Sequence, residues 1–196
     1  MEINLSSRVI EVVDYDPNWK KAFENERVML SKAIGNNAVK IEHIGSTSIV
    51  GLAAKPVIDI LIEVTSLDEL DILNKSIEAL GYLVKGENGI EGRRYFQKGG
   101  NQRSHHVHAF QTNDFHLHRH IAFKEYLIAN PTIASEYSNI KKEAVTNSDN
   151  NINVYMALKN NFIQKHEKIA IEWFGNYQEF KAGLLTVCSV SLRYTF

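Results

Sequence analysis

The sequence has very little cysteine. Cys188 is the single cysteine among 196 residues. One thiol cannot form an intramolecular disulfide framework or a cysteine-based zinc cluster, so both kinds of stabilisation are excluded. A lone thiol fits a reducing compartment, and we expect a cytoplasmic protein.

The chain also lacks a strong charge of either sign and a long apolar run. Its 22 Lys and Arg and 23 Asp and Glu give a net charge of −1, so no broad field attracts DNA or a membrane surface. Nucleic-acid binding would need a local basic patch. No stretch approaches the ~20 apolar residues that cross a bilayer, and Met1 to Val12 has no long apolar segment. We therefore expect neither secretion nor membrane spanning.

The apolar residues that are present suffice for one substantial core. Hydrophobic residues make up 44% of the chain and charged residues 23%. A chain of this length buries roughly two thirds of its unfolded surface. Without a visible repeat or flexible linker, we predict one domain over residues 1–174. The apolar, β-prone tail in residues 175–196 has three interpretations, which are an extra edge strand, a pairing segment or a cloning remnant.

Two predicted strands flank a short turn in the first third of the chain. The first covers Lys40 to Ile44 and leads into the turn Gly45 to Ser48. The second covers Val57 to Val64, where apolar residues occupy one face and Asp59 and Glu63 share the other. One face of this strand is predicted to be core, and the opposite face carries two carboxylates.

The remaining pattern predicts helices around a sheet. Asp16-Pro17 starts a helix that Gly35 can end, and Ser66 caps a second helix that Gly81 can end. The segments Tyr82 to Lys85, Arg93 to Lys98 and Arg103 to Gln111 suggest an antiparallel meander, and helices follow from Phe115 to Trp173. The fold class is therefore α+β, with a mixed or antiparallel sheet, helices packed on it and a helical C-terminal half.

The turn at Gly45 and the strand at Asp59 have a chemical interpretation. Glycine lets backbone N–H groups approach a phosphate closely, and the Ser46 and Thr47 hydroxyls can add contacts. A strand carboxylate about a dozen residues later can hold a divalent cation. These residue types predict a phosphate site at Gly45, Ser46 and Thr47, with Mg²⁺ at Asp59.

The same segment resembles a known family. Its residues Ile41 to Ser48 (IEHIGSTS) and Gly51 to Ile60 (GLAAKPVIDI) look like the signature of the GrpB family, also called UPF0157. The family resembles the nucleotidyltransferase superfamily, which implies a nucleotidyltransferase-like fold. The resemblance covers about Val9 to Phe174 and continues through Gly81-Tyr82, Arg93-Arg94, His106-Val-His108, Phe123 to Leu127 and Tyr155 to Trp173.

One position departs from the superfamily pattern. That pattern places two acidic residues, separated by one apolar residue, on the strand after the Gly-Ser turn. Asp59 fits the first acidic position, but the second is Leu61, which cannot ligate Mg²⁺. Glu63 lies on the same face about 6.6 to 7 Å further along and is the candidate substitute as catalytic and metal-binding residue.

Histidines form a second candidate group. His106 and His108 alternate onto one strand face, and His116 and His120 lie one helical turn apart. Imidazoles at such spacings can bind Zn²⁺ or act as acid or base. His108 is expected beside the Asp59 strand, either in the site or as a hydrogen-bonding residue of a partly buried sheet.

Three basic residues complete the candidate site. Lys55 precedes Pro56 and is expected either to contact phosphate or to lie exposed in its loop. Arg93 and Arg94 point to opposite faces of one strand, so at most one of them enters the cleft, and Arg94 is the candidate. Lys159 resembles a lysine of the family motif, although its helix position favours a solvated face.

The preferred hypothesis is a divergent nucleotidyltransferase-like protein that binds a nucleotide or another small phosphate compound. One version of it is a Mg²⁺-dependent nucleotidyl- or phosphotransferase. Leu61 favours the alternative of a noncatalytic binding or interaction module on the same fold. The clustered histidines support a third hypothesis, a histidine-dependent metal-binding protein.

Overall fold

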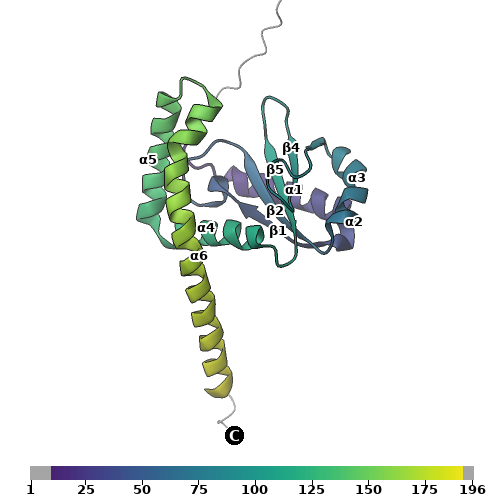
Figure 1. Cartoon of the computed structure of the whole chain (residues 1–196), viewed down its shortest axis with the longest axis vertical. Coiled ribbons are helices and arrows are strands. Elements are labelled where there is room, and N and C mark those ends of the chain that lie inside the picture. The colour runs from purple at the N-terminus through teal and green to yellow at the C-terminus, as the bar shows by residue number, and fades with distance from the viewer. Residues whose placement is uncertain (1–9, 192–196) are drawn as a thin grey trace, which may run out of the picture.

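A five-stranded sheet lies between two groups of helices (Figure 1). The protein structure is a computed structural model that describes residues 10–191, with side chains over residues 10–178. Its elements are α1 (Asn18–Ile34), η1 (Gly35–Asn37), β1 (Ala38–Ile44), η2 (Ser46–Ser48), β2 (Ile58–Val64), α2 (Leu67–Ile72), α3 (Asn74–Glu78), β3 (Tyr82–Val84), β4 (Arg94–Lys98), β5 (His105–Gln111), α4 (Phe115–Ala129), α5 (Pro131–Asn147) and α6 (Ile152–Ser191).

The strand order is β1-β2-β5-β4-β3. The predicted meander is confirmed, because β3 pairs antiparallel with β4, and β4 pairs antiparallel with β5. It joins β2 through β5, and these two central strands run parallel. The sheet is therefore mixed, and the predicted α+β class with a helical C-terminal half is confirmed.

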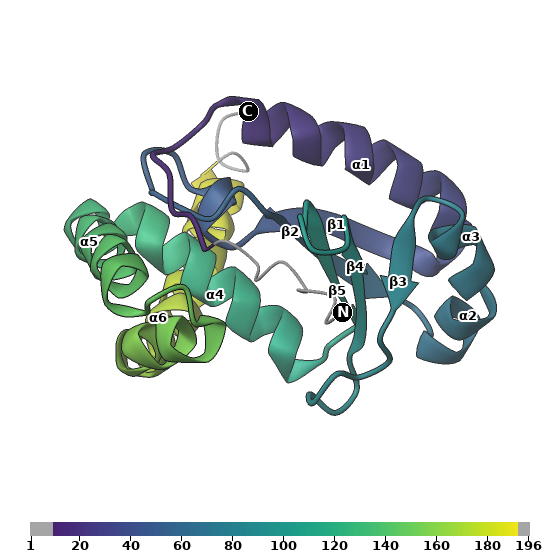
Figure 2. The same cartoon turned by 90° about the horizontal axis from the view of Figure 1, so that it is seen from above.

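The alternation predicted for β2 fixes which face is core. Ile58, Ile60, Ile62 and Val64 are almost fully buried and pack with apolar residues of α1, α2 and α3. The opposite face, which carries Asp59, points toward the helical half. Figure 2 shows α1 on one side of the sheet and α4, α5 and α6 grouped on the other.

Local signals set the ends of several helices. Asp16 Oδ1 accepts the Asn18 backbone N–H at 2.9 Å, and α1 begins at Asn18, one residue later than expected. Gly35 ends α1 with φ of 63°, as predicted. Ser66 Oγ accepts the Glu69 N–H at 3.3 Å and caps α2, which confirms the capping residue.

The helix predicted after Ser66 is wrong in one respect, because it is broken at Leu73 into α2 and α3. Leu73 has φ of −85° and ψ of 1°, outside helical geometry. Asn74 and Ser76 follow the break, and such residues hydrogen-bond to nearby backbone in competition with a helix. Two short helices result, and they bury Leu70 and Ile77 in the core.

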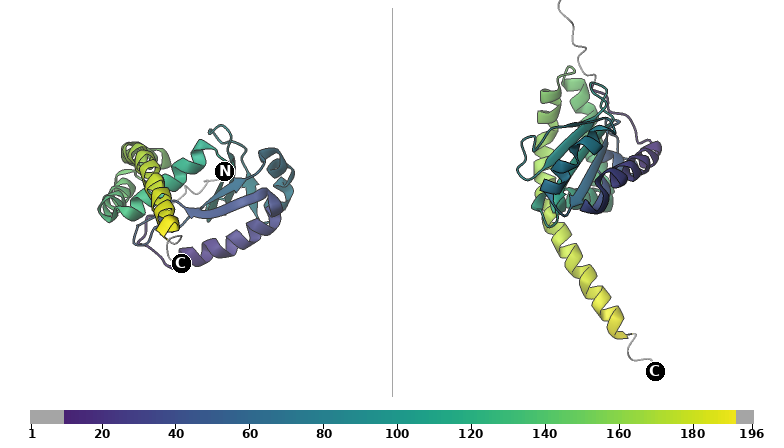
Figure 3. Two further views of the ribbon diagram at one scale, coloured as in Figure 1. Left: turned by 90° about the horizontal axis from the view of Figure 1, so that it is seen from below. Right: turned by 90° about the vertical axis from the view of Figure 1, so that its right-hand side faces the viewer.

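The long α6 crosses the predicted domain boundary at residue 174. It continues to Ser191 and projects beyond the rest of the fold (Figures 1 and 3). The extra-strand interpretation of the tail is therefore wrong over residues 175–191, because extending an existing helix needs no new nucleus. Residues 192–196 lie outside the described part. Between residues 10 and 191, no helix has the length and apolar character needed to cross a membrane.

Candidate functional site

The Gly45 turn lies directly beside Asp59. Ile44 at the end of β1 pairs with Asp59 near the start of β2, so the turn that follows β1 reaches the carboxylate. Gly45 has φ of 70°, and a Cβ added there would lie 2.5 Å from Asp59 Oδ2. Glycine is thus needed here both for backbone conformation and for the close approach of Asp59.

The hydroxyl groups of the turn have different partners. Thr47 is buried, and its Oγ1 donates to Val57 O at 3.3 Å and lies 3.0 Å from His43 Nε2. Ser48 Oγ donates to a backbone carbonyl at 2.6 Å. The Thr47 hydroxyl thus holds the turn, and Thr47 also lines the cleft described below. Ser46 lines the cleft described below.

His43 has a packing role. Its ring stacks on Phe23 with centroids 4.8 Å apart. Burial lowers the pKa of His43 to about 4, with Asp59 acting in the opposite direction. His43 is therefore neutral near pH 7, and its Nε2–H can donate to Thr47.

The parallel pairing of β2 with β5 brings two predicted histidines to Asp59. Asp59 is in register with His106. His106 Nδ1 lies 3.1 Å from Asp59 Oδ1, and His108 Nε2 lies 4.0 Å from the same oxygen. Burial would raise the Asp59 pKa, but the His106 hydrogen bond and the charges of His106, His108 and Lys159 hold it below the ordinary value. Asp59 is thus an anion stabilised by the protein itself.

The other histidines do not complete a metal centre. The rings of His108 and His120 lie 5.3 Å apart, and burial lowers their pKa values to about 3 and about 4. His116 stacks on Phe110, while His118 is exposed. Within residues 10–191, no group of three or more His, Cys, Asp or Glu is placed to hold a metal ion.

Glu63 does not share the Asp59 site. Four strand positions separate the two residues, which corresponds to roughly 13 Å. Leu61 lies between them, is 2% exposed and packs with Phe110 and Leu117. The expectation that Glu63 substitutes for the missing acid is therefore wrong in geometry, and these residues do not fit a two-metal centre.

Asp59 instead opens into a cleft of about 410 Å³ with many basic side chains. We call it the cationic cleft. Ser46 and Asp59 both line it, and among the described lining residues Asp59 is the one that carries a carboxylate. Five basic residues from five separate segments of the chain line it, and they are Lys55, Arg93, Arg103, Lys141 and Lys159.

Two lysines lie over the ring of the buried Tyr155. Lys55 Nζ lies 4.9 Å and Lys159 Nζ 5.1 Å from the centre of the Tyr155 ring. Lys159 lines the cleft, so the expectation of a solvated helix face is wrong for it. Burial lowers the Lys159 pKa, and the nearby Asp59 charge partly opposes that shift.

Lys141 is the most deeply buried of these cations. It is 2% exposed, and its Nζ donates to Ser46 Oγ at 3.0 Å and to the Ala53 carbonyl. Its Nζ also lies 4.3 Å from the centre of the Tyr137 ring. Burial, with a smaller effect of the Lys159 charge, lowers the pKa of Lys141 to about 7. Its ammonium is therefore only partly populated at neutral pH.

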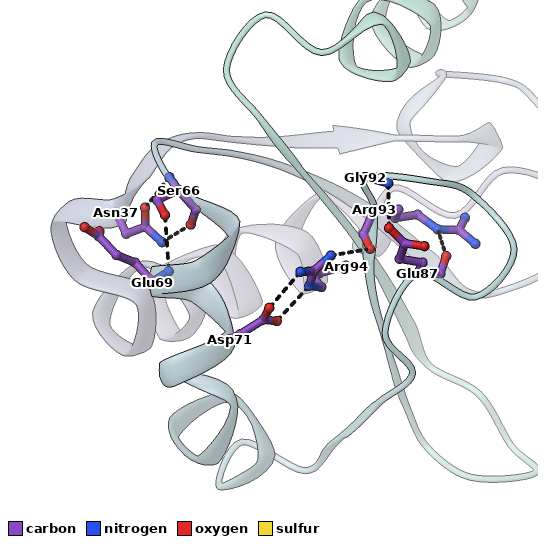
Figure 4. Close-up of polar contacts among 8 residues, drawn as sticks. All are labelled: Asn37, Ser66, Glu69, Asp71, Glu87, Gly92, Arg93 and Arg94. Atoms are coloured by element: carbon purple, nitrogen blue, oxygen red, sulfur yellow. Dashed lines mark hydrogen bonds and ion pairs between the residues drawn. The ribbon is translucent and has the colours of Figure 1, made fainter.

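Arg94, the first residue of β4, and Arg93 just before it have different partners (Figure 4). Arg94 forms two 2.7 Å hydrogen bonds with Asp71 of α2, which removes it from the cleft. The choice of Arg94 as a ligand contact is therefore corrected. Arg93 lines the cleft instead, bonded to the Glu87 and Asn88 carbonyls, with Nη1 3.4 Å from His108 Nδ1.

A smaller compartment of about 250 Å³ adjoins the cationic cleft. The two spaces share Ser46, Asp59, His108 and Lys159. The walls of the smaller space include Phe123 and Tyr137. The smaller compartment thus combines aromatic side chains with charged ones, which include Lys124 and Glu167.

Sequence reasoning missed Lys141, although a signal for it exists. The buried residues of α5 are Ala134, Tyr137, Lys141 and Ala144, which recur at helical spacing. This stripe places Lys141 on the packed face, while its neighbour Lys142 is exposed. A lysine in an otherwise buried stripe indicates a specific role for its amine.

Comparisons with known proteins agree with this fold. Residues 9–168 match the GrpB protein family. The chain is 43% identical over 166 residues to the UPF0157 protein YqkA of Bacillus subtilis, covering 85% of this chain and 48% of that protein. It therefore spans about half the length of that relative.

Solved structures show the same relationship. The conserved protein GrpB from Enterococcus faecalis superposes with a TM-score of 0.81 at 42% identity, over 84% of this chain and 99% of that one. A weaker likeness, with a TM-score of 0.41 and 14% identity, is found to the Cid1 poly(U) polymerase over 67% of this chain and 45% of that one.

Proposed function

The chain belongs to the GrpB protein family, and we propose that it binds a small phosphate-bearing ligand in the cationic cleft. One observation carries the proposal. Five basic side chains line the cleft, and Asp59 is the one acidic residue among the described residues that line it. This local excess of positive charge contrasts with the net charge of −1 for the whole chain. Such local concentration of cations favours an anionic ligand of high charge density.

The geometry assigns different tasks to these cations. Arg93 is buried and bonded to the protein, so it supplies fixed positive potential. Lys141 is also buried and bonded, but its pKa of about 7 makes its charge only partial at neutral pH. Lys55, Lys159 and Arg103 keep more exposure and are the groups that would contact phosphate oxygens. Hydrogen bonds to charged groups contribute roughly 1.5 to 3 kcal/mol each.

The aromatic side chains of the adjoining compartment favour a ligand with more than a phosphate. A nucleotide would place its phosphates among the cations and its base against the wall that Phe123 and Tyr137 form. Aromatic walls stabilise planar rings by stacking. A nucleotide is therefore the ligand class that uses both parts of the cleft.

Binding is proposed to be independent of Mg²⁺. The cations of the protein already neutralise phosphate charge, and the residues near Asp59 do not fit a two-metal centre. A metal-dependent transferase is the second candidate function, and the buried Leu61 favours a binding module over it. A transferase would lose activity in EDTA, whereas a binding module would bind the nucleotide without turnover.

Ligand-induced stabilisation tests the proposal. We expect ATP and pyrophosphate to raise the unfolding temperature in the presence of EDTA, while uncharged adenosine has a much smaller effect. Lys159→Met should weaken this response by roughly 10- to 100-fold in Kd. Lys165→Met, an exposed lysine of the same helix, is the matched control. Equal responses of the two variants, or no response to any phosphate compound, would overturn the proposal.

A further inference from the structure

Ser46 differs from its neighbouring hydroxyl groups in what it contacts. Thr47 and Ser48 each donate their hydroxyl proton to a backbone carbonyl. Ser46 Oγ lies 3.0 Å from Lys141 Nζ, and it borders both compartments of the cleft. The hydroxyl of Ser46 is therefore paired with an amine and faces the space where a ligand would lie.

The amine beside Ser46 has unusual surroundings. Lys141 is 2% exposed, and among residues 10–178 no carboxylate lies within ion-pair distance of it. The titratable groups around it are Tyr137 on its own helix, Lys159 on α6 and Asp59 on β2 across the cleft. Burial lowers its pKa to about 7, which allows a neutral amine at physiological pH.

These contacts match the requirements of an activated nucleophile. A serine hydroxyl is a weak nucleophile until an adjacent base removes its proton. A base acts best when its pKa lies near the working pH. When Lys141 is charged it donates to Ser46 Oγ, and after losing a proton it can accept one from the same oxygen.

We propose that Ser46 accepts a phosphoryl group from a phosphoanhydride bound in the cationic cleft, with Lys141 as the base. The proposal rests on the phosphate-binding function and adds a covalent step to it. Ser46 Oγ attacks the terminal phosphorus, so an Oγ–P bond forms while the bond from phosphorus to the bridging oxygen breaks. The hydroxyl proton moves to Lys141 Nζ, and the leaving group departs as an anion among Lys55, Arg103 and Lys159.

Radiolabel transfer tests the covalent step. The full chain is incubated in EDTA with ATP labelled at its terminal phosphate, or with labelled acetyl phosphate, and the modified residue is mapped by peptide mass spectrometry. We expect phosphoserine at Ser46 with one or both donors, and its loss in Ser46→Ala. Ser48→Ala is the matched control and should keep the label. Label on another residue, or no label with either donor, would overturn the proposal.

The role of Lys141 has its own readouts. Lys141→Met should reduce the labelling rate by at least about 100-fold. Lys141→Arg should do the same, because arginine keeps the charge but cannot act as a base. If these variants do not fold, the wild-type pH profile decides, since the neutral fraction of an amine with a pKa of about 7 rises about fivefold from pH 6 to pH 7. Unchanged rates in folded variants, or a flat profile, would contradict a base at Lys141.

Calorimetry with pyrophosphate tests the proposed phosphate binding separately from the proposed phosphoryl transfer. Pyrophosphate binding without any labelling of Ser46 would overturn the phosphoryl transfer and leave the binding function intact. Absence of pyrophosphate binding would overturn both. Binding together with Ser46 labelling supports both.

Discussion

Removal of the Asp59 carboxylate should strengthen phosphate binding. Asp59 is an anion held by His106, His108 and Lys159, and it borders the cationic cleft. A phosphate ligand would feel its repulsion. In Asp59→Asn this repulsion disappears, and Lys159 loses a competing partner. The sign is opposite to that expected for a metal ligand, whose loss would abolish metal-dependent binding.

The size of the effect follows from Coulomb's law. A unit charge of the ligand roughly 6 Å from Asp59 is repelled by about 0.7 kcal/mol at a dielectric constant of 80 and by about 2.8 kcal/mol at 20. Since 1.4 kcal/mol is a factor of ten, we expect the affinity for pyrophosphate to rise by about 3- to 100-fold. The gain should shrink at high salt, because ions screen exposed charges.

Calorimetric titration with pyrophosphate in EDTA measures this change. Glu63→Gln is the matched control, because it removes the same charge from the same strand face at roughly 13 Å. We expect it to leave the affinity within about twofold. If Asp59→Asn abolishes binding, and wild-type binding requires Mg²⁺, then Asp59 is a metal ligand and the reasoning is refuted.

Three further predictions concern stability. Gly45→Ala should lower the free energy of unfolding in urea by more than Gly35→Ala does. Both glycines have positive φ, which alone costs an alanine roughly 1 to 2 kcal/mol. Only the methyl group at position 45 would also meet the Asp59 carboxylate. Thr47→Val should lower the unfolding free energy by roughly 1 to 3 kcal/mol while the pyrophosphate affinity stays unchanged. The folded state depresses the pKa of Lys141 from 10.5 to about 7, so the unfolded chain binds more protons between these values. Stability relative to Lys141→Met should therefore rise as pH increases from about 7 to about 10, and a constant difference would contradict the shift.

The sequence predicts the centre of the site well, because local patterns determine it. The match over residues 9–168 confirms the family resemblance drawn from the segment around Gly45 and Asp59. Strand alternation correctly placed His106 and His108 on one face. These inferences need only the period of a strand and the position of one turn.

The cations of the cleft depend on contacts that no local pattern specifies. Alternation shows that Arg93 and Arg94 point to opposite faces, but Asp71 on a distant helix decides which one leaves the cleft. Lys141 and Lys159 reach the cleft only because α5 and α6 pack beside the sheet. Sequence periodicity therefore does not predict the part of the site that is formed by side chains brought together through tertiary packing.

Leu61 lies where β2 packs against β5 and α4. Its side chain packs with Phe110 of β5 and Leu117 of α4, so α4 rests on the position where a second carboxylate would lie. A carboxylate there would be enclosed by apolar groups, at a cost of several kcal/mol. In turn, α4 packs against α5 and α6 through residues such as Tyr126, and these helices carry Lys141 and Lys159. The apolar contact that excludes a second metal ligand thus also holds the lysine-bearing helices over Asp59, and both follow from one packing arrangement.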